Sequence, residues 1–282
     1  MPSRRSFIKM TSASLAATGI SVSSLETFAS AAQVDNTPAK FKLRFAFASD
    51  GHYGEPKTDY KTTHTNIINW LNQEHQANHL DFVVFNGDLV HDNPELLKEL
   101  KANHLSRLTV PYYAIPGNHD RSTPAQWKEN FGYEDNFSFE SNGVEFVLAN
   151  TSNTKGEYVC PDNNFIHNEL EKFRDRKIVF VVLHIPPHRW LHEQDFFEDC
   201  PDTLSVIHRY QNVKAVFHGH DHTLDSVFYT GSKLPHFFDA HYGGSWGTDY
   251  YGFRIVEISL GDEIRTYQVN ASKNPVLNSN KI

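Results

Sequence analysis

The segment Phe82-Val83-Val84-Phe85-Asn86-Gly87-Asp88 decides the fold class. It begins as an apolar run and ends in a glycine and a carboxylate, which is typical of a buried strand whose carboxyl end carries a polar group. Polar, ligand-type residues follow an apolar run in the same way in segments 45–52, 112–120, 179–184 and 215–222. Open α/β sheets place their sites at the carboxyl ends of strands. The recurrence therefore predicts an α/β protein with a polar site along one edge of its strands.

The rest of the chain alternates predicted strands and helices. Helical spacing of apolar residues covers 60–76, 94–107 and 163–174, the second with a proline in its first turn. Strands are expected at 43–48, 81–85, 112–115, 137–140, 144–149, 178–183, 213–217, 226–230, 235–239, 253–260 and 264–269, and residues 271–282 read as a tail. We therefore expect one α/β domain in which two mixed β-sheets pack together and helices lie outside.

The first 31 residues have the features of an export signal. Ser3-Arg4-Arg5-Ser6-Phe7-Ile8-Lys9 is a twin-arginine motif, residues 10–28 are weakly apolar, and Ala29-Ser30-Ala31 offers a cleavage site. The alternative is a disordered N-terminus with a chance arginine pair. Because residues 10–28 form a stretch that is too short and contains too many polar residues, we expect no stable membrane span. The motif predicts a signal peptide over 1–31, a folded domain over 32–282, passage through the twin-arginine export machinery, and a periplasmic or otherwise exported location.

The composition limits the domain size and the kinds of molecule that the protein is expected to bind. The 282 residues fit one large domain or two small ones, and 39% hydrophobic residues are enough for a sizeable core. A net charge of −8 disfavours non-specific binding to nucleic acid, so no nucleic-acid partner is expected. The two cysteines, Cys160 and Cys200, each begin a Cys-Pro-Asp triplet. They are candidates for a disulfide in an oxidising compartment, and two free thiols are the alternative that the sequence leaves open.

The polar residues at the strand ends form a mixed oxygen and nitrogen set. Hydrolysis of a phosphate ester needs a strong nucleophile and relief of negative charge, and two metal ions about 3.5–4 Å apart supply both. Such a donor set suits zinc, iron or manganese. A carboxylate must bridge the two ions, and Asp88 is well placed for it. The candidate metal ligands are Asp50, His52, Asp88, Asn118, His184, His220 and His222.

The ordered pattern resembles the calcineurin-like metallophosphoesterase superfamily. That pattern is Asp-x-His, Gly-Asp, Gly-Asn-His-Asp/Glu, His and Gly-His-x-His, and every part is present, in order, over residues 43 to 224. The resemblance implies a four-layer α/β/β/α sandwich and a two-metal phosphoesterase that acts on a small phosphate ester.

Site roles follow from the same resemblance, position by position. It implies that Asp50, His52 and His222 hold the first metal, while Asn118, His184 and His220 hold the second. It implies that Asp88 bridges them together with a hydroxide that attacks phosphorus in line. His119 would be catalytic, touching the phosphate and protonating the leaving oxygen, and Asp120 would orient His119.

Two departures separate the chain from the purple acid phosphatases. That branch has tyrosine three residues after the bridging aspartate, where this chain has His91, and it lacks the histidine that stands here at position 52. The pattern is closer to class III cyclic-nucleotide phosphodiesterases and bacterial glycerophosphodiesterases.

Several other residues remain ambiguous. His75 and His79 read as a surface helix face. His188, His192, His218 and His241 lie near the predicted site or are ordinary packed residues. The loop aromatics Trp190, Phe196, Phe197, Trp246 and Tyr250 either stack on a flat leaving group or cap the core, and Tyr53 is a pocket candidate.

Three functions are compatible with the residues. The leading one is an exported, dinuclear-metal phosphoesterase that hydrolyses phosphomonoesters or phosphodiesters. A non-catalytic exported protein that binds metal or phosphate is the second, disfavoured by the intact His119-Asp120 pair. An exported nuclease is the third, disfavoured by the acidic net charge. Substrate identity, metal identity and oligomeric state are not determined by the sequence.

Overall fold

A computed structural model describes residues 41–231 and 233–271. The predicted signal peptide, residues 1–31, and nearly all of the predicted C-terminal tail lie outside the described residues. Within the described residues, no helix is both long and apolar enough to cross a membrane.

The first sheet has five strands in the order β11-β10-β1-β2-β3. Its bounds are β1 Leu43–Ala48, β2 Phe82–Asn86, β3 Tyr112–Ile115, β10 Gly252–Ile258 and β11 Ile264–Asn270. β1, β2 and β3 run parallel, and β10 and β11 are antiparallel to their neighbours. The carboxyl ends of β1, β2 and β3 therefore meet at one edge of this sheet.

The second sheet has six strands in the order β4-β5-β6-β7-β9-β8. Its bounds are β4 Phe137–Ser141, β5 Val144–Leu148, β6 Val179–Val182, β7 Val213–His218, β8 Val227–Thr230 and β9 Leu234–Phe238. β5, β6, β7 and β9 are parallel, and β4 and β8 are the antiparallel edges. Both sheets are mixed, which confirms that part of the prediction.

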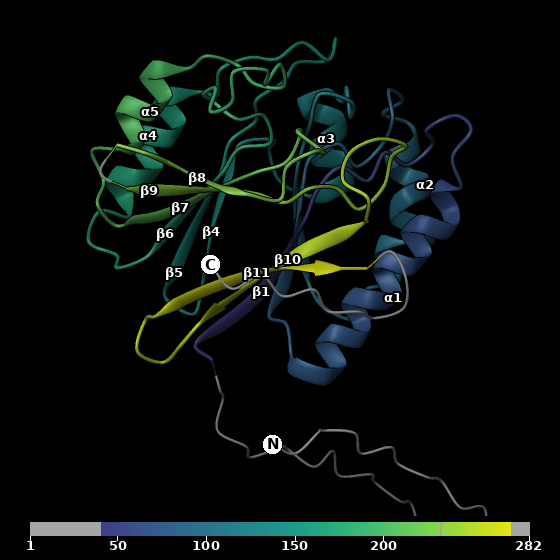
Figure 1. The fold of residues 1–282 in the computed structure, drawn as a ribbon, viewed down its shortest axis with the longest axis horizontal. Helices are drawn as coiled ribbons and strands as arrows, with labels where there is room; N and C mark the ends of the chain where they lie inside the picture. The colour runs from purple at the N-terminus through teal and green to yellow at the C-terminus, as the bar shows by residue number, and fades with distance from the viewer. Residues whose placement is uncertain (1–40, 232, 272–282) are drawn as a thin grey trace, which may run out of the picture. The chain divides into compact units, whose positions relative to one another are not determined.

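The helices lie on the outer faces of the two sheets, as Figure 1 shows. α1 (Tyr60–Asn78), α2 (Leu96–Asn103) and α3 (Pro124–Phe131) cover the first sheet, with Ile67, Leu97 and Trp127 in one apolar cluster with Ala46 and Val83. α4 (Asn163–Lys172) and α5 (Pro201–Ile207) cover the second sheet through a separate cluster.

Aromatic side chains fill the space between the two sheets. The ring centroids of Phe45 and Phe146 lie 5.1 Å apart, and Phe47 stacks on Phe217 with ring centroids 4.1 Å apart. Because strand side chains alternate between faces, the same strands also supply the outer clusters. The order of layers is therefore α/β/β/α, as the resemblance implied.

One predicted helix needs correction, and two helices were not predicted. The helix predicted over 94–107 is α2 followed by a short 3-10 turn at Leu105–Arg107, and His104 between them leaves the helical region with φ −126°. The sequence reading missed α3 and α5, which each begin with a proline at the first turn. In α3, Thr123 and Gln126 form a capping box, a signal that the residues Thr-Pro-Ala-Gln already carried.

Candidate metal centre

The predicted ligands come from both sheets and meet at the ends of their parallel strands. Asp50 and His52 follow β1, Asp88 follows β2, and Asn118 follows β3. His184 follows β6, and His220 and His222 follow β7. All seven side chains are buried. The site therefore lies where the two sheets meet, and each sheet supplies part of it.

The backbone bends sharply at these positions. Asp50, His52, Asp88 and His220 have positive φ values of 60°, 48°, 51° and 68°. Non-glycine residues rarely adopt this left-handed region, and such strain gathers at functional sites. A Cβ added to Gly117 would lie 2.2 Å from Oδ1 of Asp88 and 2.7 Å from Nε2 of His184, so only glycine fits beside the site.

The first group of ligands consists of Asp50, His52 and His222. Nε2 of His222 lies 3.0 Å from Oδ1 of Asp50 and 3.0 Å from Nε2 of His52. The other ring nitrogen of each histidine is already engaged, since Nδ1 of His222 donates to the Trp246 carbonyl at 3.1 Å and Nδ1 of His52 lies 3.0 Å from Nδ1 of His91. The three ligand atoms therefore face one another.

The second group consists of Asp88, His184 and His220, with Asn118 beside Gly117. Nδ1 of His184 donates to the Asn86 carbonyl at 2.7 Å, which leaves its Nε2 3.3 Å from Oδ2 of Asp88. Among the described residues, Nε2 of His220 and Oδ1 of Asn118 are buried with no hydrogen-bond partner. Buried polar atoms are nearly always paired, so these two indicate a ligand that completes the site.

Asp88 lies between the two groups. Its Oδ2 is 3.3 Å from Nε2 of His184 and 3.8 Å from Nε2 of His52, while its Oδ1 accepts the His119 backbone N–H at 2.8 Å. One carboxylate oxygen is thus shared by histidines of both groups, which is the placement a bridging ligand requires.

The residues fit two metal ions of the zinc, iron or manganese type. Imidazole nitrogens whose second nitrogen is fixed by a carbonyl are the usual ligands of such ions, and carboxylate and amide oxygens complete each set. Asp50, His52 and His222 would hold one ion. Asn118, His184 and His220 would hold the other, with Asp88 shared.

Electrostatics in the site favour ionised carboxylates beside charged imidazoles. Burial opposes charge on Asp50, yet His222 and His184 lower the pKa of this carboxyl to about 2. Burial likewise opposes charge on His184, yet Asp88 and Asp50 raise its pKa to about 9. In contrast, burial lowers the pKa of His220 to about 3. A metal ion bound here would take the place of the protons on His184 and His222, because an imidazole nitrogen must be deprotonated to coordinate a metal.

His119 stands at the mouth of the site, with a quarter of its side chain exposed. Its Nδ1–H donates to Oδ1 of Asp92 at 2.9 Å, and Nε of Arg121 is 2.9 Å from the same oxygen. The expectation that Asp120 orients His119 is therefore wrong as to the contact. Asp120 is fully buried and accepts the backbone N–H groups of Val90 at 2.9 Å and Gly117 at 2.8 Å, so it holds the two ligand loops in place.

Other histidines have identifiable partners. His91 stacks on His119 with centroids 4.8 Å apart, and His241 stacks on His222 at 5.0 Å, so both support the site. His218 bonds His236 at 2.8 Å inside the second sheet. Nδ1 of His75 lies 3.1 Å from the backbone N of Leu80 and 2.9 Å from its carbonyl oxygen, at the end of α1. Among the described residues, His75 and His79 belong to no group of three candidate metal ligands.

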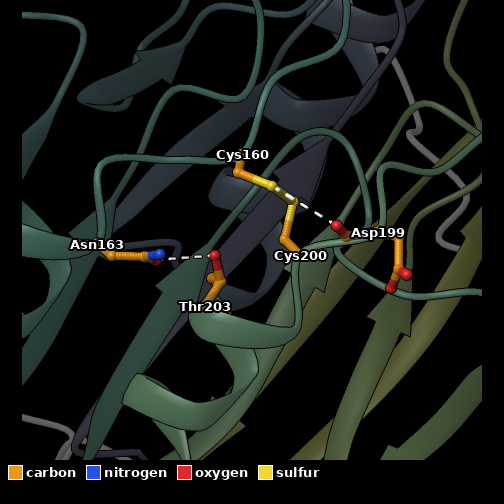
Figure 2. The surroundings of a disulfide bond; sticks show 5 residues. All are labelled: Cys160, Asn163, Asp199, Cys200 and Thr203. Atoms are coloured by element: carbon orange, nitrogen blue, oxygen red, sulfur yellow. Dashed lines mark hydrogen bonds between the residues drawn. A yellow bond between two sulfur atoms is a disulfide. The ribbon is translucent and has the colours of Figure 1, made fainter.

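The two cysteines form a disulfide, which resolves the alternative left open by the sequence. Cys160 and Cys200 are joined across 40 residues, with Cα atoms 5.6 Å apart (Figure 2). Beside it, the Thr203 hydroxyl donates to Oδ1 of Asn163 at 2.8 Å. The bridge connects the segments that precede α4 and α5. These segments carry Tyr158 and Phe196, whose rings lie 4.5 Å and 5.7 Å from the ring of His220.

Sequence comparison identifies the family. The sequence model of the calcineurin-like phosphoesterases matches residues 43–224, and the chain belongs to this family. The family uses a dinuclear metal centre, and the ligand groups described above are its candidates here. Curated relatives are phosphodiesterases by name, which places the chain among metallophosphoesterases with phosphodiesterase homologues.

Two curated relatives show the level of sequence identity and coverage. A 3′,5′-cyclic-nucleotide phosphodiesterase of Nostoc is 29% identical over 167 residues, 54% of this chain and 62% of the relative. A probable cyclic nucleotide phosphodiesterase of Coxiella burnetii is 26% identical over 199 residues, 66% of this chain and 79% of the relative. The match to the Nostoc protein therefore spans about three fifths of that protein's length.

Solved structures agree on the fold. A dimetal phosphatase from Danio rerio has a TM-score of 0.68 at 12% identity, covering 82% of this chain and 97% of that protein. GAP50, the anchor in the inner membrane complex of Plasmodium, has a TM-score of 0.60 at 15% identity, covering 85% and 88%. At these identities the likeness concerns the fold alone.

Proposed function

We propose that the chain is an exported, metal-dependent hydrolase of small phosphodiesters, with phosphomonoesters as the second substrate class. The observation that carries the proposal is the convergence of two buried ligand groups on Asp88, with His119 at the open side. When bound, two metal ions would offset the charge of the phosphoryl group and lower the pKa of a bound water.

The protein's own residues complete the chemistry. His119 would meet the substrate at the exposed side of the ligand groups. Its Nε2 would give a proton to the leaving oxygen while its Nδ1–H continues to donate to Asp92. The Asp92 carboxylate stabilises the protonated imidazole, and Arg121 holds that carboxylate in place. Burial of the ligand groups keeps bulk water from the carboxylates and strengthens their attraction for cations.

The preference for diesters rests on the relatives. Those named above are cyclic-nucleotide phosphodiesterases, and a probable glycerophosphodiester phosphodiesterase of Arcobacter nitrofigilis is 26% identical over 164 residues. The substrates in these names share an alkyl leaving group, which departs poorly as an alkoxide. A positioned proton donor such as His119 is what such a leaving group needs.

Two observations support export. The twin-arginine motif at Ser3–Lys9 is an address read by export machinery that carries folded proteins. The Cys160–Cys200 disulfide persists in an oxidising compartment and would be reduced in the cytoplasm. A fusion of residues 1–40 to a reporter that works only outside the cytoplasm tests this. Loss of export on replacing Arg4 and Arg5 by lysine is the expected result.

Activity is tested on the purified chain loaded with Mn²⁺ or Zn²⁺. We expect hydrolysis of bis(p-nitrophenyl) phosphate and of alkyl diesters, abolition by chelation, and loss of about 10²–10⁴ in kcat for His119→Ala on alkyl diesters. His75→Ala is the matched control, because His75 lies at the end of α1, away from the ligand groups. Absence of hydrolysis with every metal would favour the binding-protein alternative, and full activity of His119→Ala would exclude the assigned role.

A further inference from the structure

Two exposed aromatic side chains touch metal-ligand histidines. Among the described residues, the exposed large hydrophobic side chains are Leu191, Phe196, Tyr229, Trp246 and Leu260. Phe196 lies against His220, and Trp246 lies against His222. An exposed aromatic ring beside a polar site offers a face on which a flat group of a ligand can stack.

Trp246 packs directly on the first ligand group. Its indole stacks on the ring of His222, with centroids 4.4 Å apart and planes 9° apart, and its carbonyl accepts the His222 Nδ1–H. The indole is also 4.8 Å from the ring of His52 and 6.4 Å from that of His119. The proton donor, the ligands and the indole thus belong to one site. Trp246 is 36% exposed, so part of the indole remains uncovered.

A cavity of about 370 Å³ adjoins this indole. Its lining consists of His241, Ser245, Trp246, Gly247, Thr248, Asp249, Tyr250 and Tyr251. Three of these are aromatic residues besides His241, and Ser245, Thr248 and Asp249 add hydrogen-bonding groups. Neither lysine nor arginine lines the cavity. The cavity therefore suits a flat, uncharged group with polar edges.

We propose that Trp246 and this cavity bind the leaving group of the substrate, and that the leaving group is a nucleoside or a comparably flat heteroaromatic alcohol. This inference rests on the proposed function and names its substrate class, a nucleoside phosphodiester. Aliphatic alcohols such as glycerol have no face to stack and would leave the indole exposed. A leaving group that carries further phosphates would meet the Asp249 carboxylate without any lysine or arginine in the lining to balance it.

Binding of adenosine to the zinc-loaded protein tests the subsite without catalysis. Stacking of a base on an aromatic side chain corresponds to about a five-fold or larger change in affinity on replacement by alanine. By isothermal titration calorimetry, we expect adenosine to bind the wild type, with Trp246→Ala at least five-fold weaker and Trp246→Phe close to wild type. Tyr229→Ala, at an exposed aromatic residue in β8, is the matched control and should leave adenosine binding unchanged. Equal affinity in the wild type and Trp246→Ala, or no adenosine binding to the wild type, overturns the proposal.

Kinetics separates this inference from the proposed function. Trp246→Ala should raise KM for 3′,5′-cyclic AMP at least five-fold, with little effect on KM for a glycerophosphodiester. Metal content, measured in parallel, should stay at the wild-type value in Trp246→Phe, which retains an aromatic ring on His222. If the wild type hydrolyses diesters but Trp246→Ala changes both substrates alike, the nucleoside subsite is wrong and the phosphodiesterase proposal stands. If the wild type hydrolyses neither substrate but binds adenosine through Trp246, the nucleoside subsite stands and the phosphodiesterase proposal is wrong.

Discussion

Asp92→Asn tests which carboxylate serves the proton donor. The structure places Oδ1 of Asp92 at 2.9 Å from Nδ1 of His119, and asparagine keeps the size and the hydrogen-bond acceptor but removes the charge. A charge pair about 4 Å apart is worth about 1 kcal/mol in water and about 4 kcal/mol near a protein surface. Because the Asp92 side chain is 40% exposed, the lower part of that range applies. We therefore expect kcat to fall about 5- to 30-fold.

The leaving group makes the assay specific. Protonation matters most for an alkyl leaving group and least for p-nitrophenolate, which departs without it. Asp92→Asn should thus lower kcat for 3′,5′-cyclic AMP or a glycerophosphodiester and nearly spare bis(p-nitrophenyl) phosphate. An equal loss on both classes of substrate would point to disturbed metal binding, and metal content measured alongside decides that case.

Asp120→Asn is the matched comparison. Burial and the nearby Asp88 raise the pKa of the Asp120 carboxyl to about 7, and both of its oxygens accept backbone N–H groups. Asparagine leaves one of those N–H groups facing an NH₂, which costs about 1–3 kcal/mol of stability. We expect a lower Tm here and an unchanged Tm in Asp92→Asn. The reasoning is refuted if Asp92→Asn equals the wild type on alkyl diesters while Asp120→Asn, at full stability, loses activity on them.

Three further outcomes are expected. Burial lowers the pKa of His64 to about 3, so below about pH 6.5 this side chain binds a proton in the unfolded chain but stays neutral in the folded one. Between pH 7 and pH 5, the free energy of unfolding, measured with urea in EDTA, should fall by about 2 kcal/mol more for the wild type than for His64→Leu. Replacing Cys160 and Cys200 by serine opens a 40-residue loop and should cost about 3–4 kcal/mol in denaturant unfolding, and a cost below 1 kcal/mol would contradict the loop-entropy reasoning. Gly247→Ala would place a Cβ 2.5 Å from the Cβ of His222, at a backbone φ of +125° that favours glycine, so metal analysis of this variant should show fewer than two ions per chain. Gly132→Ala is the control: no atom outside the neighbouring residues lies within 4 Å of the added Cβ, and both ions should be retained.

Much of the fold was predictable because its signals are local. An apolar run such as Val179–Val182 can be satisfied only by burial on both faces, and the structure has β6 there. The bounds of β1 and β3 agree with the predicted ranges to the residue. Helices α3 and α5 have eight and seven residues and few apolar positions, so neither shows a clear apolar period, whereas Leu96, Leu97 and Leu100 mark the equally short α2.

The convergence of the candidate metal ligands was also predictable from the sequence, since each follows a strand directly; their role as ligands stays a prediction. The partner of His119 was not predictable. Asp120 is adjacent in sequence, but the turn after Gly117 directs its carboxylate to backbone amides. Asp92 comes from the loop after β2, 27 residues earlier, and only the parallel pairing of β2 with β3 brings it to the imidazole.

The same limit applies to Trp246 and to the disulfide. Nothing local distinguishes Trp246 from Trp190, yet the first lies on His222 and the second packs against Phe228 and His236. Cys160 and Cys200 meet because α4 and α5 cover the same sheet, which is a property of the tertiary structure.

The division of ligands between the two sheets has a consequence for motion. Asp50 and His52 belong to the first sheet and His222 to the second, while Asp88 belongs to the first and His184 to the second. Each bound ion would therefore act as a cross-link between the layers, and any partial opening of the sandwich would have to release it first. Amide hydrogen exchange in β2 and β6 should then slow together when metal is added, so that the two layers open as one cooperative unit instead of separately.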